Sequence, residues 1–162
     1  LMASAVPMRE YLAVPNECEP RVAINDFPQT YLFAATFSNL DQWVRKGTSP
    51  PRGQPIEVKE GQRGTVNFVN DDLGIARGGV RTPWVDVPAG AFYPNMTGEG
   101  TCRDIGYWIP FSWPRLEAIY GNYANYSRKF LEAVDRTVKE RWILPADGEK
   151  IKAEFRTKVS SN

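Results

Sequence analysis

The chain has 162 residues, of which 42% are hydrophobic and 12% aromatic, and this composition predicts one globular domain rather than a disordered or fibrous protein. Its 20 basic and 19 acidic residues give a net charge of +1 without long runs of one sign, which argues against nucleic acid as a partner. The sequence also lacks an apolar run of the roughly 18 to 20 residues that a membrane span needs.

Four prolines, at positions 7, 15, 20 and 28, predict an irregular N-terminal segment over residues 1–28. A helix is predicted over residues 29–46 and is expected to end at Gly47. Its apolar residues repeat at intervals of four, three and four, which is typical of an amphipathic helix: Phe33, Phe37, Leu40 and Val44.

Residues 48–111 are predicted to hold short strands and a long loop. Alternation of apolar and polar residues favours strands at 56–58 and 65–69. Glycines, prolines and aromatic residues predict an irregular loop from 88 to 111, and a loop of that length usually covers another part of a protein.

The stretch GGVRTPWVDVP, residues 78–88, is typical of a buried strand that glycines and prolines interrupt. A separation of five places Arg81 and Asp86 on opposite faces of a strand, so they are not expected to pair unless Pro83 introduces a bulge. We therefore expect this stretch to join the chain to the rest of a larger fold, with each charge paired across that junction.

Residues 112–159 are predicted to be helical. Ser112 is a suitable N-cap for a short helix that ends at Tyr120. A longer helix is predicted over 123–142, where apolar residues recur every four positions, and a third helix restarts near Asp147. The whole chain, 1–162, is thus interpreted as a single domain fragment.

Two cysteines and two glycosylation sequons favour an oxidising compartment. An even cysteine count is typical of disulfide-bonded secreted chains, and Cys18 and Cys102 are the two in this sequence. Asn95 and Asn125 begin Asn-X-Thr and Asn-X-Ser triplets, and Asn95 is the better acceptor because it lies in a predicted loop. The sequence predicts a Cys18–Cys102 disulfide, glycosylation at Asn95 and Asn125, and a location outside the cell or in the secretory-pathway lumen.

The chain contains no histidine, which excludes a Ser-His-Asp or Cys-His arrangement made by this chain alone. No nucleotide-binding or phosphate-binding glycine motif is present, and the Asp71-Asp72 pair reads as a solvated turn. We expect no catalytic residue, no cofactor and no metal ligand in this chain. Five aromatic residues are candidates for lining a pocket, although packing within the protein explains them equally well: Trp84, Phe92, Tyr93, Tyr107 and Trp108.

Four pieces of sequence, in this order, resemble the C-terminal part of proteins described as alpha/beta hydrolase domain-containing. They are LDQWVRKGTSPP (40–51), GGVRTPWVDVP (78–88), CRDIGYWIPFS (102–112) and WILPADGEKI (142–151). The resemblance implies a serine hydrolase ancestry, an esterase-like or lipase-like reaction and a largely parallel sheet flanked by helices. It also implies a nucleophilic serine upstream and a general-base histidine just ahead of the 29–46 helix, where this chain has none.

Three interpretations remain open at this stage. In the first, the chain is the C-terminal product of a processed precursor, which a start at Leu1 without a targeting segment favours. In the second, the protein is an inactive hydrolase scaffold. In the third, the chain is an independent domain. A complete hydrolase sheet needs more residues than this chain has, because each parallel crossover takes a dozen or more.

We therefore expect an α/β fold class: the C-terminal portion of an alpha/beta hydrolase fold, with few strands plus packed helices, completed by a second chain. That partner is the N-terminal chain of the same precursor or a second subunit. The assembled protein is expected to hydrolyse a carboxyl ester, with a small ester or lipid as ligand. The alternative is a catalytically inactive hydrolase-fold glycoprotein with a structural, storage or ligand-binding role.

Overall fold

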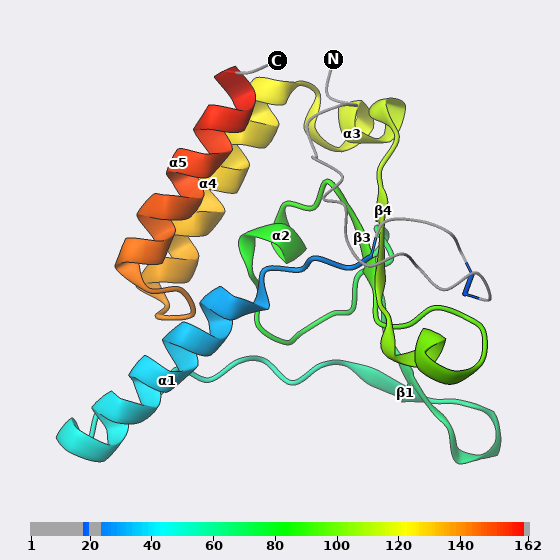
Figure 1. The fold of residues 1–162 in the computed structure, drawn as a ribbon, viewed down its shortest axis with the longest axis horizontal. Helices are drawn as coiled ribbons and strands as arrows, with labels where there is room; N and C mark the ends of the chain where they lie inside the picture. Colours follow the sequence, from blue (N-terminus) through cyan, green and yellow to red (C-terminus); the bar gives the residue numbers. More distant parts are fainter. Residues whose placement is uncertain (1–17, 20–23, 161–162) are drawn as a thin grey trace.

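A computed structural model of the protein describes residues 18, 19 and 24–160, and it combines long helices with two short hairpins (Figure 1). The helices are α1 Gln29–Lys46, α2 Pro83–Asp86, α3 Trp113–Tyr120, α4 Tyr123–Lys139 and α5 Pro145–Ser160. The strands are β1 Val58–Glu60, β2 Val66–Phe68, β3 Gly90–Tyr93 and β4 Tyr107–Pro110, and 3-10 turns occupy Gln62–Gly64 and Gly100–Asp104. None of the described helices combines the length and apolar composition that crossing a bilayer requires.

Helix α1 has the bounds that its apolar periodicity predicts. It ends because Gly47 adopts a left-handed conformation, with φ of 68°, which glycine reaches without a steric penalty. The Gly47 N–H donates to the carbonyl of Trp43 at 3.0 Å, so the last turn of the helix is closed. Basic Arg45 and Lys46 lie in that turn, where they oppose the negative end of the helix dipole.

Helices α4 and α5 lie side by side and form the main hydrophobic core (Figure 1). Phe130 and Val134 of α4 are almost fully buried, and the Phe130 ring stacks on Phe155 of α5 with centroids 4.6 Å apart. Phe130 and Val134 therefore do not form an exposed apolar face. The chain covers them itself, because the turn after α4 returns α5 along the same apolar stripe.

The predicted C-terminus of α4 and the predicted N-terminus of α5 each differ from the structure by a few residues. Helix α4 ends at Lys139 rather than 142, because Arg141 takes a positive φ of 65° and the Trp142 N–H donates to the Thr137 carbonyl. Helix α5 begins at Pro145, two residues before Asp147. A proline is tolerated in a first helical turn because the N–H that it lacks has no intrahelical partner there.

Both sheets in the described part of the chain are two-stranded and antiparallel, in contrast to the largely parallel sheet that the family resemblance implies. Strand β1 pairs with β2 so that Val58 faces Phe68, and β3 pairs with β4 so that Tyr93 faces Tyr107. The 88–111 segment, expected to be an irregular loop, thus contains a hairpin. Its irregular part is limited to the connection between β3 and β4.

Residues 78–88 do not form the predicted strand. Gly78 has a φ of 81°, and a Cβ at this position would lie 2.0 Å from the Pro55 carbonyl oxygen, so the glycine permits a close chain crossing. Pro83 then opens the short helix α2, in the first-turn position that suits proline. This helical turn brings Arg81 Nε to 2.5 Å from Asp86 Oδ1, so the expectation that they would not pair was wrong.

A second, smaller core surrounds the disulfide between Cys18 and Cys102. Both cysteines and Met96 are fully buried. Two isolated bridges lie beside this core, in which Glu19 pairs with Thr97 and Ile24 pairs with Tyr107. The disulfide therefore attaches the start of the described chain to the connection between β3 and β4, across a sequence separation of 84.

Replacing both cysteines with alanine should destabilise the protein by about 4 to 5 kcal/mol, because the unfolded chain regains the freedom that closing a loop of this length removes. Urea denaturation followed by far-UV circular dichroism measures the free energy of unfolding. The matched control is the wild-type protein in excess dithiothreitol, which should lose the same amount. An unchanged unfolding midpoint in both samples would show that this bond adds no stability.

Candidate functional site

The five aromatic residues predicted to line a pocket all contact other aromatic rings. Across the β3–β4 hairpin, Tyr93 stacks on Tyr107 with centroids 4.5 Å apart, and Phe92 lies 6.2 Å from Trp108. Trp84, in α2, stacks on Tyr31 of α1 at 6.1 Å and meets Phe130 of α4 edge-on.

Phe27, which the sequence analysis did not single out, joins these two groups. Its ring lies 5.1 Å from Phe92 and 6.2 Å from Trp84, both in edge-to-face geometry. The hairpin and the helices therefore share one chain of ring contacts that passes through the residue preceding Pro28. The only sequence signal for Phe27 was its place two residues before the predicted helix.

Two hollows lie on or near the helices. One, between α3 and α4 beside Tyr120 and Tyr126, has a volume of about 20 Å³, which is room for little more than a water molecule. Burial raises the pKa of Tyr120 to about 12, and its hydroxyl donates to the Pro88 carbonyl at 2.8 Å, so this phenol is a structural donor. The second is an open hollow of about 400 Å³ lined by Asp86, Val87, Lys129, Glu132, Ala133 and Arg136.

The charges beside that open hollow form a cluster that we call the Asp86 cluster: Arg81, Asp86 and Arg136. Asp86 accepts hydrogen bonds from both guanidinium groups, one on each carboxylate oxygen. Arg81 also donates to the Ala76 carbonyl, and Arg136 to the Arg81 carbonyl. The partners of Arg81 and Asp86 thus lie within this chain rather than across a junction with another part of the fold. The cluster links α2 to α4, and its carboxylate and both guanidinium groups form contacts that stabilise the fold.

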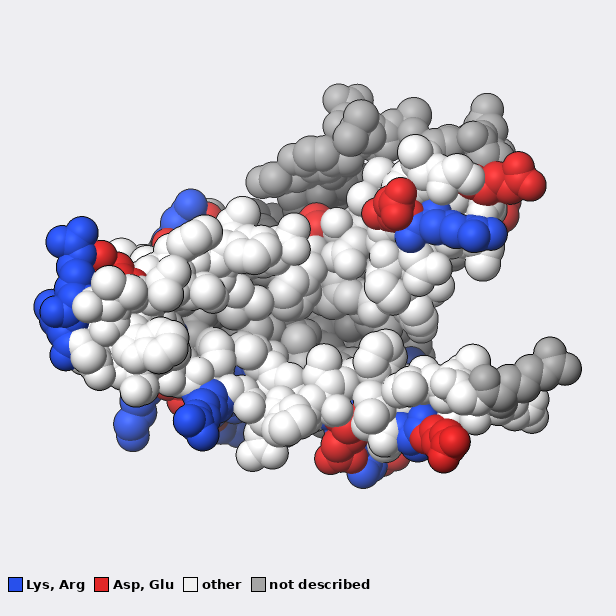
Figure 2. Space-filling view, turned by 90° about the horizontal axis from the view of Figure 1, so that it is seen from below, with Lys and Arg blue, Asp and Glu red and all other residues white. Residues whose placement is uncertain are grey.

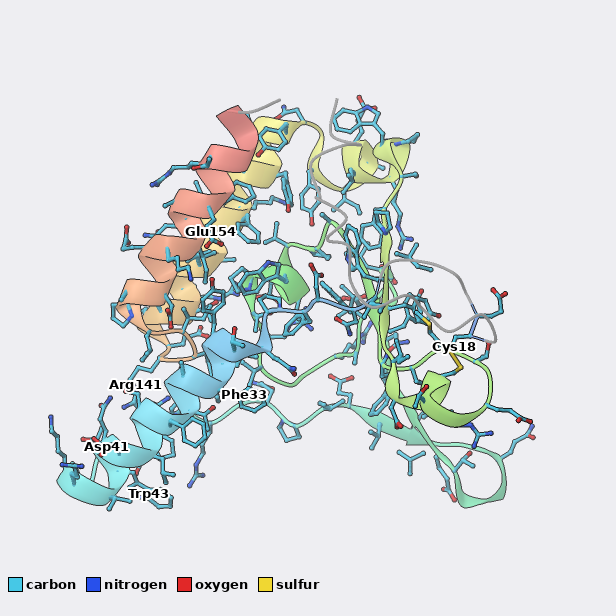
Figure 3. The ribbon with its side chains drawn as sticks, in the orientation of Figure 1. Cys18, Phe33, Asp41, Trp43, Arg141 and Glu154 are labelled. Atoms are coloured by element: carbon cyan, nitrogen blue, oxygen red, sulfur yellow. A yellow bond between two sulfur atoms is a disulfide. The ribbon has the colours of Figure 1, made fainter. Side chains whose placement is uncertain are left out.

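The most unusual surface belongs to α1. Five of its large apolar residues are between 49% and 77% exposed: Phe33, Phe37, Leu40, Trp43 and Val44. The residues that are buried are the small Ala35 and the polar Asn39, whose side chain donates to the Arg141 carbonyl at 2.9 Å. Figure 3 shows Phe33 and Trp43 on the side of α1 away from Arg141. The helix therefore contacts its own chain through its less apolar side.

The β1–β2 hairpin repeats this arrangement. Its register places Val58, Val66 and Phe68 on one face, and all three are more than half exposed. A two-stranded hairpin is marginal without packing on one face, so this face also lacks a neighbour. Figure 2 views the molecule from the side on which α1 and β1 lie; charged side chains are at its edges, and its middle is uncharged and hollowed.

No cluster of three or more metal-ligating side chains occurs within residues 18, 19 and 24–160. The side chain of Asn95 is exposed after β3, whereas Asn125 lies in the first turn of α4, where its N–H donates to the Asn122 side chain at 2.9 Å.

Comparison with known proteins gives one match. A family model described as an alpha/beta hydrolase domain matches residues 3–153. No curated protein and no solved structure matches the chain significantly.

Replacing Arg136 with Gln should destabilise the protein by about 1 kcal/mol, because it removes one of two charged donors from the partly buried Asp86 carboxylate. The matched control is Arg128→Gln, which breaks an exposed ion pair with Glu132 one helical turn away and should cost no more than about 0.5 kcal/mol. Urea denaturation of the two variants decides between them. Equal losses would mean that the Asp86 cluster is no more important than a surface pair.

Proposed function

The chain belongs to the alpha/beta hydrolase domain family, and from this membership we propose that it forms the C-terminal part of a hydrolase-fold protein completed by a second chain. The partner is the N-terminal chain of the same precursor or a separate subunit. The family match spans most of the sequence, yet the described strands form only two antiparallel hairpins. A parallel sheet with its crossover connections would come from the partner.

The observation that carries this proposal is the exposed apolar face of α1. Complete burial of one large apolar side chain is worth about 1.5 to 3 kcal/mol, so five half-exposed side chains leave roughly 5 kcal/mol of favourable burial unused. That amount is comparable to the net stability of a small domain. A partner that covers this face therefore gains enough free energy to hold α1 firmly.

The proposed reaction of the assembled protein is hydrolysis of a carboxyl ester in a small molecule or a lipid. A serine oxygen of the partner attacks the ester carbonyl, a base takes the serine proton, and the alcohol leaves; water then releases the acid from the acyl-serine. Backbone N–H groups of the partner stabilise the oxyanion. This chain contains no histidine and supplies no catalytic residue; its 88–111 segment covers the pocket.

The proposed location is outside the cell or in the lumen of the secretory pathway. A disulfide that closes a long loop is typical of oxidising compartments, and Cys18 and Cys102 are both committed to one. The exposed Asn95 is consistent with a glycosylated surface. Neither a cofactor nor a nucleic acid is part of this proposal.

One observation favours a second candidate function, that of an inactive hydrolase-fold glycoprotein with a structural, storage or ligand-binding role. The general-base histidine that the family resemblance implies just ahead of α1 has no counterpart in the sequence. A scaffold that has lost its base keeps the fold and loses the reaction.

The two candidate functions differ in their reaction with a fluorophosphonate probe, which labels an activated serine. The native complex should carry one label on the co-purifying chain, identified by intact mass, and heat-denatured complex should carry none. A complex with intact fold and no label on any chain would reject the esterase and favour the inactive glycoprotein.

Replacing Phe37 with Asp should abolish co-purification of the partner, because a charge on the apolar face of α1 cannot be desolvated without a counter-ion. Ala153→Asp, on the exposed side of α5, is the matched control and should leave the complex intact. Pull-down followed by analytical ultracentrifugation measures the assembly, and circular dichroism checks that both variants remain helical. Full assembly of Phe37→Asp would place the partner elsewhere.

A further inference from the structure

The three residues of the sequon at Asn95 lie in three different environments. The Asn95 side chain is exposed, Met96 is fully buried, and Thr97 forms a bridge with Glu19. The bridge consists of reciprocal backbone hydrogen bonds of 2.9 and 2.7 Å and a third bond of 3.1 Å, which the Thr97 hydroxyl donates to the Glu19 carbonyl. The acceptor is therefore accessible, while the two residues that follow it are held.

This restraint combines contacts within the β3–β4 connection with the bridge to Glu19, which is distant in sequence. The Met96 N–H donates to the carbonyls of Cys102 and Ile105, and Glu19 directly follows Cys18. Because the Cys18–Cys102 disulfide is the covalent link that holds these segments together, its closure fixes the backbone of the sequon.

Glycan transfer requires the sequon in an open state. The Asn95 Nδ2 atom forms a bond to the anomeric carbon of a lipid-pyrophosphate-linked oligosaccharide, the carbon–oxygen bond to the pyrophosphate breaks, and the amide releases one proton. The transferring enzyme recognises the asparagine together with the threonine two residues later. In the folded protein the Thr97 hydroxyl and its N–H are both engaged with Glu19.

We propose that Asn95 accepts an N-linked glycan only before Cys18 and Cys102 pair, so that closure of this disulfide decides its occupancy. The inference rests on the secretory location in the proposed function. Synthesis at about 5 to 20 residues per second brings Cys102 out within roughly a second of Asn95. Disulfide formation takes seconds to hours, so glycan transfer and closure compete on overlapping time scales.

Asn125 provides an internal control. It lies outside the loop that the disulfide closes, and the N–H of this residue is bound to the side chain of Asn122, three residues away. Its environment depends on the local start of α4 rather than on Cys18. The occupancy of Asn125 is therefore independent of the redox state.

The experiment expresses the full protein in a secretory cell, with a C-terminal tag that carries its own sequon as a reporter of entry into the lumen. Pulse-labelling with and without dithiothreitol is followed by site-resolved mass spectrometry. Reductant should raise the occupancy of Asn95 toward completion and leave Asn125 and the tag unchanged. The double variant Cys18→Ser/Cys102→Ser should show the same high occupancy without reductant.

A second measurement separates restraint of the sequon from poor recognition. Purified, oxidised protein that lacks a glycan at Asn95 is incubated with microsomal transferase and its lipid-linked donor. The protein should stay unmodified until it is reduced, whereas a synthetic peptide of residues 90–101 should be modified at once. Modification of the oxidised protein, or failure of the peptide, overturns the proposal.

The outcomes also distinguish this proposal from the one on which it rests. Equal occupancy of Asn95 with and without reductant, whether complete or absent, overturns the role of the disulfide, while a modified tag still supports the secretory location. If the full precursor is expressed and its tag stays unmodified, the secretory location is rejected. The proposed role of the disulfide is then rejected with it.

Discussion

The side on which α1 attaches to its own chain determines which of its side chains remain exposed. Asn39 donates a hydrogen bond to the Arg141 carbonyl, Ala35 is buried, and Tyr31 stacks on Trp84, so α1 is held by its less apolar side. Arg141 extends this attachment by donating to the Ser49 carbonyl after the helix. The large apolar residues are thereby directed outward, and they form the face that the proposed partner would cover.

The described part of the molecule has two cores of different kinds. The α4–α5 pair buries a conventional apolar stripe, whereas the opposite end of the molecule depends on a disulfide with a few buried residues. Phe27 connects the first of these cores to the β3–β4 hairpin, because its ring contacts both Trp84 and Phe92. The segment before α1 is thus the link through which the hairpin and the helices keep a common arrangement.

The sequence predicted the elements that have a strong local signal, and failed where tertiary contacts decide. The bounds of α1 follow from its periodicity and from Gly47, but Phe37 and Phe130 show the same four-residue spacing with opposite burial. Which stripe is covered depends on the path of α5. Residues 78–88 were wrongly predicted to form a strand, because a four-residue helix is too short to show a helical repeat in the sequence. This error placed Arg81 and Asp86 on opposite faces, although they form an ion pair.

The disulfide also closes part of the covalent chain into a ring. The ring from Cys18 to Cys102 contains α1, β1, β2, α2 and β3, while β4, α3, α4 and α5 follow it as an open tail. A proteolytic nick within the ring leaves both ends attached through the sulfur atoms. A nick in the tail instead leaves α5 attached by non-covalent contacts alone, so the same protease would leave the molecule whole or divide it according to the site of cleavage.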